Sequence, residues 1–302
     1  MGKGSSDGWQ GLRIIEEGSI GPGIDMESIT GSMIKGSALE VLSKIKTSSI
    51  DMVFLDPPYF LQLPRKDLIR WNQNNVVVAV RDSWDSFTSF EEYDEFIQRT
   101  LKEVKRILKP SGTLWVISTY HSLFRIGKAM QDLGFWILND IHWVKTNPMP
   151  NWLGVRFTNA TETLLWALRD KDGKGYTFNR DAAKELGVGK VGANIWVLPI
   201  CTGNERLKGS DGKRLHSTQK PIELLRRVIL TSTSEGDIVL DPFAGTGTTG
   251  YAAAALGRRF VMVELDGNYV KGAMERFSKP PIVRTYQNED LIRIEDPNDI
   301  DR

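Results

Sequence analysis

The residues best suited to chemistry are Asp56, Pro57, Pro58 and Tyr59, which directly follow the apolar run 50–55. Proline cannot continue a sheet interior, so the sequence predicts a buried strand that ends at this turn. The Asp56 carboxylate and the Pro57 carbonyl can accept both hydrogens of an exocyclic amine and localise its lone pair, while the prolines hold the backbone. Tyr59 offers a ring face for a base rotated out of a duplex. The alternative is an ordinary turn after a buried strand.

A second candidate site is the glycine-rich turn at 241–249, Asp-Pro-Phe-Ala-Gly-Thr-Gly-Thr-Thr, which follows a predicted strand and opens a predicted helix. It lacks the lysine of a phosphate-binding P-loop. Gly245, Gly247 and Gly250 have dinucleotide-loop spacing, but the carboxylate of Asp241 disfavours a pyrophosphate and suits a cationic cofactor such as S-adenosylmethionine. The alternative is a structural glycine turn.

Glu264 ends the next predicted strand, about 20 residues further on, where a carboxylate can accept hydrogen bonds from both hydroxyls of a ribose. The two acids together make the cofactor interpretation stronger than the glycines alone. The predicted cofactor-binding residues here are Asp241, Phe243, Ala244, Gly245, Thr246, Gly247, Thr248 and Glu264.

Alternating strands and helices predict an α/β fold with a doubly wound, mostly parallel sheet. Strands are expected at 50–55, 113–118, 135–144, 163–168, 238–240 and 260–263. Helices are expected at 90–108, from after 118 through 130, at 220–231, through 255, and from 269. We expect four regions: a flexible arm (1–30), one half of the core (31–145), an inserted region (146–215) and the other half of the core (216–302).

Composition narrows the class of protein. The 302 residues carry 39 basic and 38 acidic side chains, so binding to a polyanion would need a local patch. One cysteine and three scattered histidines predict neither a disulfide nor a zinc site. No signal sequence and no apolar run near the roughly 18 residues of a membrane span are found, so we expect a cytoplasmic protein. Cys201 lies outside both turns and is expected to be chemically passive.

The two motifs together resemble those of the amino-methyltransferases of DNA restriction and modification. The catalytic motif precedes the cofactor motif, an order similar to the circularly permuted β class. Further stretches resemble adenine-N6 enzymes of the GANTC cell-cycle-regulated type and their GATC relatives. These stretches are 131–140, 145–151, 156–164 and 216–221, and the resemblance spans about 33 to 279.

This resemblance implies a Rossmann-like fold that binds S-adenosylmethionine, a target-recognition region at 146–215, and direct methyl transfer to N6 of a flipped-out adenine in duplex DNA. It also implies a homodimer formed through the catalytic fold. A cofactor-side motif is implied at Ser217, Thr218, Gln219 and Lys220, where a helix begins. Two features depart from the family: Gly36-Ser37 replaces the usual Gly-Asp, and the C-terminal DNA-binding extension of the GANTC enzymes has no counterpart.

Amides and cations in the 146–215 region could contact DNA, although a charged loop can also be merely solvated. The predicted DNA-binding residues are Asn147, Asn151, Arg156, Arg206, Lys208, Lys213 and Arg214. A loop with Arg65, Lys66 and Arg70 is expected to close over the base, and Trp84 belongs to a shared stretch. Cytosine-N4 methylation, a catalytically silent DNA-binding regulator and an RNA target remain as alternatives.

Overall fold

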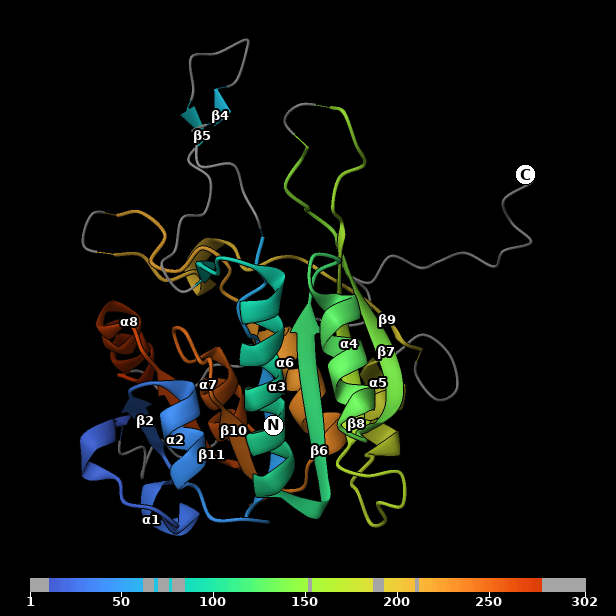
Figure 1. Cartoon of the computed structure of the whole chain (residues 1–302). Coiled ribbons are helices and arrows are strands. Elements are labelled where there is room, and N and C mark those ends of the chain that lie inside the picture. The colour runs from blue at the N-terminus through green and yellow to red at the C-terminus, as the bar shows by residue number, and fades with distance from the viewer. Residues whose placement is uncertain are drawn as a thin grey trace.

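The computed structural model describes residues 11–61, 68–69, 76–77, 85–151, 154–186, 193–209 and 212–278. Across these residues nine strands form one sheet in the order β1-β2-β11-β10-β3-β6-β8-β7-β9 (Figure 1). The strands of this sheet are β1 (Arg13–Glu16), β2 (Ser32–Lys35), β3 (Ile50–Leu55), β6 (Leu108–Ser118), β7 (Trp136–Lys145), β8 (Thr161–Leu168), β9 (Ile195–Leu198), β10 (Ile238–Asp241) and β11 (Arg259–Glu264). A separate antiparallel pair is formed by β4 (Leu68–Ile69) and β5 (Val76–Val77).

The sheet is mostly parallel, as predicted. Every neighbouring pair is parallel except the two that involve β8, which runs antiparallel to both β6 and β7. The carboxyl ends of the parallel strands therefore share one edge, and the amino end of β8 lies at that same edge. Ligands of open α/β sheets bind beyond this edge.

Helices cover both faces of the sheet (Figure 1). They are α1 (Met26–Ile29), α2 (Ala38–Lys44), α3 (Phe90–Ile107), α4 (Leu123–Asp132), α5 (Arg180–Leu186), α6 (Ile222–Ser232), α7 (Thr248–Ala255) and α8 (Gly267–Phe277). Side chains alternate along β3: Val53 and Leu55 join a core with α2, α3 and α4, while Met52 and Phe54 join a core with α6, α7 and α8. Two cores on opposite faces define the doubly wound fold.

The expectation of a loose arm over 1–30 is wrong for its described part, residues 11–30. Strand β1 pairs in parallel with β2, in the register Arg13 to Ser32. The Arg13 guanidinium donates to the carbonyl of Ser28 at 2.8 Å, and Met26 and Ile29 are buried. Sheet pairing and burial at long range, rather than local periodicity, order this segment. Residues 1–10 lie outside the described part of the chain.

The inserted region also differs from its expected bounds of 146–215. Strand β8 lies inside the sheet between β6 and β7, and β9 adds the outer edge. Trp166 on β8 stacks on Trp115 of β6, with ring centroids 5.2 Å apart. The connections before, between and after these strands therefore project, but the strands themselves belong to the core. In Figure 1 the β7–β8 loop and the loop around 200–215 rise from the carboxyl edge of the sheet.

Element boundaries follow the predicted ones closely at α3, whose N-cap Ser89 accepts from the Glu92 N–H at 3.2 Å. Strand β6 begins earlier than the expected 113, because Leu108 already pairs with Ile50 of β3. The register then shifts between Ile50 and Met52, and Pro110 and Gly112, predicted as a break, are accommodated in that irregularity.

Candidate active site

The two predicted motifs meet at the carboxyl edge of the sheet. Strands β3 and β10 are neighbours, so the turn that begins at Asp56 faces the glycine-rich turn that begins at Asp241. A cavity of about 200 Å³ lies between them, and a smaller one of about 20 Å³ lies beside it. Asp56, His216, Thr218 and Phe243 line both cavities. The catalytic and cofactor candidates thus form one site.

The Asp56–Tyr59 turn is held by contacts from α3 and from the segment before it. The Tyr93 hydroxyl donates to the carbonyl of Pro58 at 2.9 Å. The Asp85 carboxylate accepts from the backbone N–H groups of Phe60 at 2.6 Å and Leu61 at 2.8 Å. Phe60 has a φ of 49°, in the left-handed region that a non-glycine residue seldom adopts. The two hydrogen bonds therefore stabilise this left-handed backbone conformation directly after Tyr59.

A cluster of aromatic rings packs around Phe60. The Phe60 ring stacks on Tyr93 with centroids 5.7 Å apart and meets Phe90 edge-on at 5.2 Å. Phe96 connects this cluster to the glycine-rich turn, because its ring centroid lies 5.9 Å from that of Phe243. This packing links the two turns and gives the larger cavity an apolar wall.

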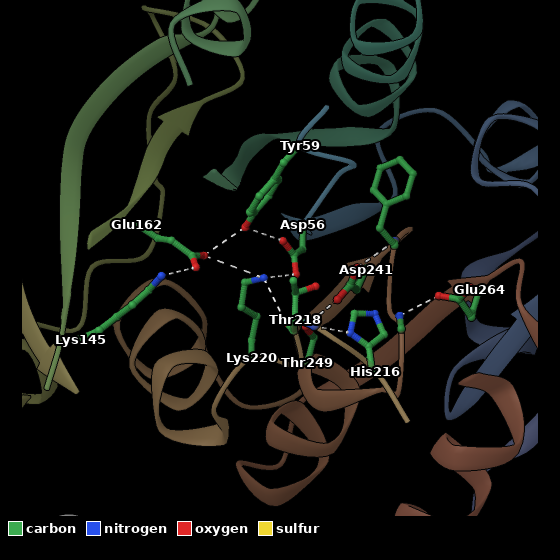
Figure 2. Close-up of polar contacts among 12 residues, drawn as sticks. Asp56, Tyr59, Lys145, Glu162, His216, Thr218, Lys220, Asp241, Thr249 and Glu264 are labelled. Carbon is green, nitrogen blue, oxygen red and sulfur yellow. Dashed lines mark hydrogen bonds and ion pairs between the residues drawn. The ribbon is translucent and has the colours of Figure 1, made fainter. Parts of the chain in front are cut away.

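Both oxygens of Asp56 are engaged within the protein (Figure 2). Oδ1 accepts from the Tyr59 hydroxyl at 2.9 Å, and Oδ2 lies 2.7 Å from Nζ of Lys220. Burial raises the pKa of Asp56, and the positive charge of Lys220 opposes that rise. Lys220, expected on the cofactor side, thus makes an ion pair with the carboxylate predicted to be catalytic.

Glu162 is a member of the site that sequence reasoning did not single out. Its Oε2 accepts from the Tyr59 hydroxyl at 3.1 Å, and its Oε1 lies 2.8 Å from Nζ of Lys145 (Figure 2). Burial alone would raise the pKa of Glu162, but the cations of Lys220 and Lys145 outweigh it and lower the pKa. The only signal in the sequence was the family-like stretch 156–164, which contains this residue.

The two acids of the cofactor motif hold the glycine-rich turn in shape. Asp241 accepts from the Phe243 N–H at 2.9 Å and from the Thr249 hydroxyl at 2.5 Å. Glu264 accepts from the Gly245 N–H at 2.8 Å. Burial raises the pKa of Asp241 to about 7 and that of Glu264 to about 7. A bound cation would favour the charged form of both carboxylates.

Gly245 is required by conformation and by space. Its φ is +52°, and a Cβ built there would lie 2.9 Å from Nε2 of His216. His216 accepts at Nδ1 from the Thr218 N–H at 3.2 Å. Burial, and then the charge of Lys220, lowers the pKa of His216 to about 3. The imidazole is therefore neutral at physiological pH.

The segment 217–220 lies beside the smaller cavity, which is lined by Thr218, Gln219 and Lys220 but not by Ser217. The Gln219 side chain donates to Sγ of Cys201 at 3.1 Å, so it also has a structural role. Helix α6 begins at 222, two residues later than expected. Burial raises the pKa of Cys201 to about 12, which keeps this buried thiol protonated and unreactive.

The departure at Gly36-Ser37 coincides with a carboxylate from elsewhere in the chain. The Ser37 N–H donates to Oε2 of Glu17 at 2.8 Å, and Glu17 leaves no room for a side chain at position 36. Both Gly36 and Ser37 line the larger cavity. Glu17 belongs to the segment that was expected to be a loose arm.

The predicted DNA-binding residues lie on the two loops that rise from the carboxyl edge of the sheet, and their side chains differ in how exposed they are. Lys208, Lys213 and Arg214 are exposed. Arg206 is half-buried, close enough to Cys201 and His216 to affect the pKa of both.

The polar residues of the β7–β8 loop make local contacts. Oδ1 of Asn147 accepts from the Ile200 N–H at 2.8 Å, Nδ2 of Asn151 donates to the Arg156 carbonyl at 2.9 Å, and exposed Arg156 donates to the Tyr120 hydroxyl at 2.9 Å. Residues 65, 66 and 70, expected in a closing loop, and residue 84, noted in a stretch shared with the family, lie outside the described residues.

The residues that the structure describes include no helix long and apolar enough to cross a membrane. They also contain no group of three or more His, Cys, Asp or Glu residues placed to hold a metal ion.

A parallel sheet with a carboxylate-flanked glycine turn and a neighbouring Asp-Pro-Pro-Tyr turn defines a methyltransferase site. The family model N6_N4_Mtase, described as DNA methylase, matches residues 50–275. Because this match covers well over half of the chain, the protein belongs to that DNA methylase family.

Two curated relatives agree. The chain is 48% identical to Type II methyltransferase M.HinfI of Haemophilus influenzae over 252 residues, which cover 83% of this chain and 69% of the relative. It is 41% identical to Type II methyltransferase M2.DpnII of Streptococcus pneumoniae over 244 residues, 81% of this chain and 88% of the relative.

Solved structures show the same fold. The M1.HpyAVI–SAM complex superimposes with a TM-score of 0.58 at 25% identity, covering 82% of this chain and 98% of that one. The cytosine-N4-specific PvuII DNA methyltransferase gives a TM-score of 0.64 at 22% identity, covering 83% and 88%, and this likeness concerns the fold alone.

The site fits S-adenosylmethionine, because Glu264 lines the larger cavity, which has an apolar wall from Phe243 and Leu265, and Asp241 lines the smaller cavity beside it. The protein is an S-adenosylmethionine-dependent DNA methyltransferase.

Proposed function

We propose that the protein methylates the N6 amino group of an adenine rotated out of duplex DNA. The observation that carries this proposal is the place of Asp56, whose carboxylate lines both cavities of the site and lies beside the Tyr59 ring. An aspartate at this position favours adenine, because the cytosine-N4 enzymes that the motif resembles more often begin it with serine.

The cofactor would be held by residues of the glycine-rich turn and of the end of β11. The Asp241 carboxylate suits the ammonium group, and Glu264 suits the ribose hydroxyls, since each oxygen of a carboxylate has a second lone pair beyond the one used in the loop. The apolar wall at Phe243 suits the adenine ring of the cofactor. When bound, S-adenosylmethionine supplies an electrophilic methyl group on its sulfonium.

The catalytic turn prepares the nucleophile. Asp56 and the carbonyl of Pro57 accept the two hydrogens of the target amine, so the nitrogen lone pair is directed away from the ring. Tyr59 stacks on the base, and Pro58 is fixed by Tyr93 so that the acceptors do not reorganise. Direct attack needs no thiolate, in agreement with the protonated state of Cys201. The methylated amine loses its extra proton readily, so neutral His216 need not act as a base.

Contact with DNA is proposed for the two loops that rise from the catalytic edge. Exposed cations can neutralise phosphates, and amides can read base edges. The residues proposed for this are Asn147, Asn151, Arg156, Arg206, Lys208, Lys213 and Arg214. The order of the sequence motifs supports the β class, and the homodimer stays a prediction from the resemblance.

The test is transfer of tritiated methyl from S-adenosylmethionine to duplex DNA, followed by analysis of the labelled nucleosides. We expect the label in N6-methyladenine. Asp56→Ala should abolish transfer while the dissociation constant of the cofactor changes little. Asp132→Asn, on the exposed side of α4, is the matched control and should retain activity. Label confined to cytosine would replace this proposal with N4 methylation. Label in RNA alone, when RNA is offered in a parallel reaction, or no label with intact cofactor binding, would support the remaining alternatives.

A further inference from the structure

Glu162 is a buried charge at the active site that the reaction outlined above does not use. Its side chain is 11% exposed, and it is the second residue of β8. Since β8 runs against its neighbours, its amino end reaches the edge at which the parallel strands end. This arrangement brings Glu162 to Tyr59, although 103 residues separate them in the chain.

Glu162 belongs to a set of charged side chains that pair with one another (Figure 2). One oxygen lies 2.8 Å from Nζ of Lys145, and the other lies 3.9 Å from Nζ of Lys220 and accepts from the Tyr59 hydroxyl. With Asp56, the set holds two carboxylates and two ammonium groups. Removing one member of such a buried set leaves an uncompensated charge.

The Tyr59 hydroxyl lies between the two carboxylates. It is 2.9 Å from Oδ1 of Asp56 and 3.1 Å from Oε2 of Glu162. A phenol carries one proton, so it donates fully to one acceptor at a time. While it donates to Asp56, it weakens the hydrogen bond that the same oxygen can accept from a target amine, because two donors then share the electron density of one oxygen.

We infer that Glu162 is a positioning residue that takes the hydrogen bond of the Tyr59 hydroxyl and so leaves Oδ1 of Asp56 to accept from the target amine. This inference rests on the proposed function. No proton is transferred, because the Tyr59 O–H bond stays intact and only the acceptor of its hydrogen bond changes. Burial, and then the charges of Asp56 and Glu162, raises the pKa of Tyr59 well above its ordinary value, which keeps the phenol protonated. Lys145 holds the Glu162 carboxylate in place for this exchange.

The test combines a nearly isosteric substitution with a compensated one. Glu162→Gln should lower kcat by roughly tenfold or more, because a neutral amide is a weaker acceptor than a carboxylate, with little change in cofactor affinity or in KM for DNA. Glu162→Gln alone leaves Lys145 buried without its partner and can weaken folding. The double variant Glu162→Gln/Lys145→Met removes both charges and should recover thermal stability but not kcat. Glu95→Gln, an exposed carboxylate on α3, is the control and should keep full activity.

A double-mutant cycle with Tyr59→Phe separates positioning from a purely structural role. Without the hydroxyl no exchange is needed, so Glu162→Gln should cost much less kcat in the Tyr59→Phe protein than in the wild type. Additive effects, or full kcat in Glu162→Gln/Lys145→Met, would overturn the inference. The wild type is measured in the same assay: its failure to label adenine would instead overturn the proposed function.

Discussion

The ammonium group of Lys220 lies 2.7 Å from Oδ2 of Asp56, although the two residues come from opposite halves of the core. Lys220 is 6% exposed, and burial by itself would lower its pKa, but the carboxylates of Asp56 and Glu162 outweigh burial and raise it. The pair therefore joins the predicted cofactor-side segment directly to the residue proposed to activate the amine. Figure 2 shows how this contact crosses the site.

The first prediction concerns this ion pair. In Lys220→Met, the burial that raises the pKa of Asp56 is no longer opposed by a cation, so that pKa rises further. Activity requires the ionised carboxylate, so the acid limb of kcat against pH should move upward. A shift of about one unit would lower kcat about tenfold on that limb. Lys128→Met, on an exposed lysine of α4, should leave the profile unchanged.

Loss of a buried partner also destabilises the fold, by about 3–5 kcal/mol. The thermal melting of Lys220→Met should be measured together with the pH profile. An acid limb that stays in place in a folded variant would contradict the assigned role of the ion pair.

The second prediction concerns cofactor binding and pH. Asp241 and Glu264 each have a pKa of about 7, so in the free protein each is about half protonated at that pH. A cationic ligand favours the ionised form, and raising the pH supplies that form. The cofactor dissociation constant should therefore fall as the pH rises from about 6 to about 8, and binding should release protons. Calorimetry in buffers of different ionisation enthalpy measures both effects.

Variants separate the contributions to this pH dependence. Asp241→Asn should weaken binding and flatten the pH dependence, whereas Glu235→Gln, an exposed acid ahead of β10, should do neither. Affinity independent of pH in the wild type would show that neither carboxyl titrates on binding.

The third prediction concerns the left-handed backbone at Phe60, directly after Tyr59. Asp85→Ala removes the acceptor of the Phe60 and Leu61 N–H groups, which are partly buried, so the cost should stay below the roughly 3 kcal/mol of a fully buried unsatisfied donor. Because this backbone conformation directly follows the predicted catalytic turn, kcat should fall more than cofactor affinity. Asp85→Asn keeps one acceptor oxygen and should be intermediate. Steady-state kinetics and thermal melts measure these effects, with exposed Glu95→Gln on α3 as the control. Any ranking other than wild type, then Asp85→Asn, then Asp85→Ala would contradict the prediction.

The fourth prediction concerns DNA. Neutralising one phosphate contact should reduce the slope of log K against log salt by about 0.9 for duplex DNA. We expect this from Lys208→Gln, Lys213→Gln and Arg214→Gln, measured one at a time by fluorescence anisotropy over a salt series. Lys46→Gln is the control. Lys46 lies before β3, at the opposite edge of the sheet, so this substitution should leave the slope unchanged. Slopes equal to the wild type for all three loop variants would remove this loop from the DNA interface.

The parallel core could be predicted because its signals are local. Apolar runs that end at Asp56 and at Asp241 mark strand ends, and the carboxyl ends of neighbouring parallel strands must share an edge. The segment with β1 could not be predicted, since it owes its order to pairing with β2 rather than to its own periodicity. The predicted bounds of the inserted region were wrong for a similar reason. The apolar run of β8 was visible, but its place between β6 and β7 was not.

The sequence by itself determined the reactive turn, the cofactor turn, and the class of chemistry that they imply together. Residue types and spacing suffice there, because each motif is a short segment whose backbone its own prolines and glycines constrain. Only the tertiary structure decided that Lys220 pairs with Asp56 and that Glu162 shares the Tyr59 hydroxyl. Those contacts depend on strand order and on the reversed direction of β8, which bring residues distant in the chain to one buried point where few charges can lie unpaired.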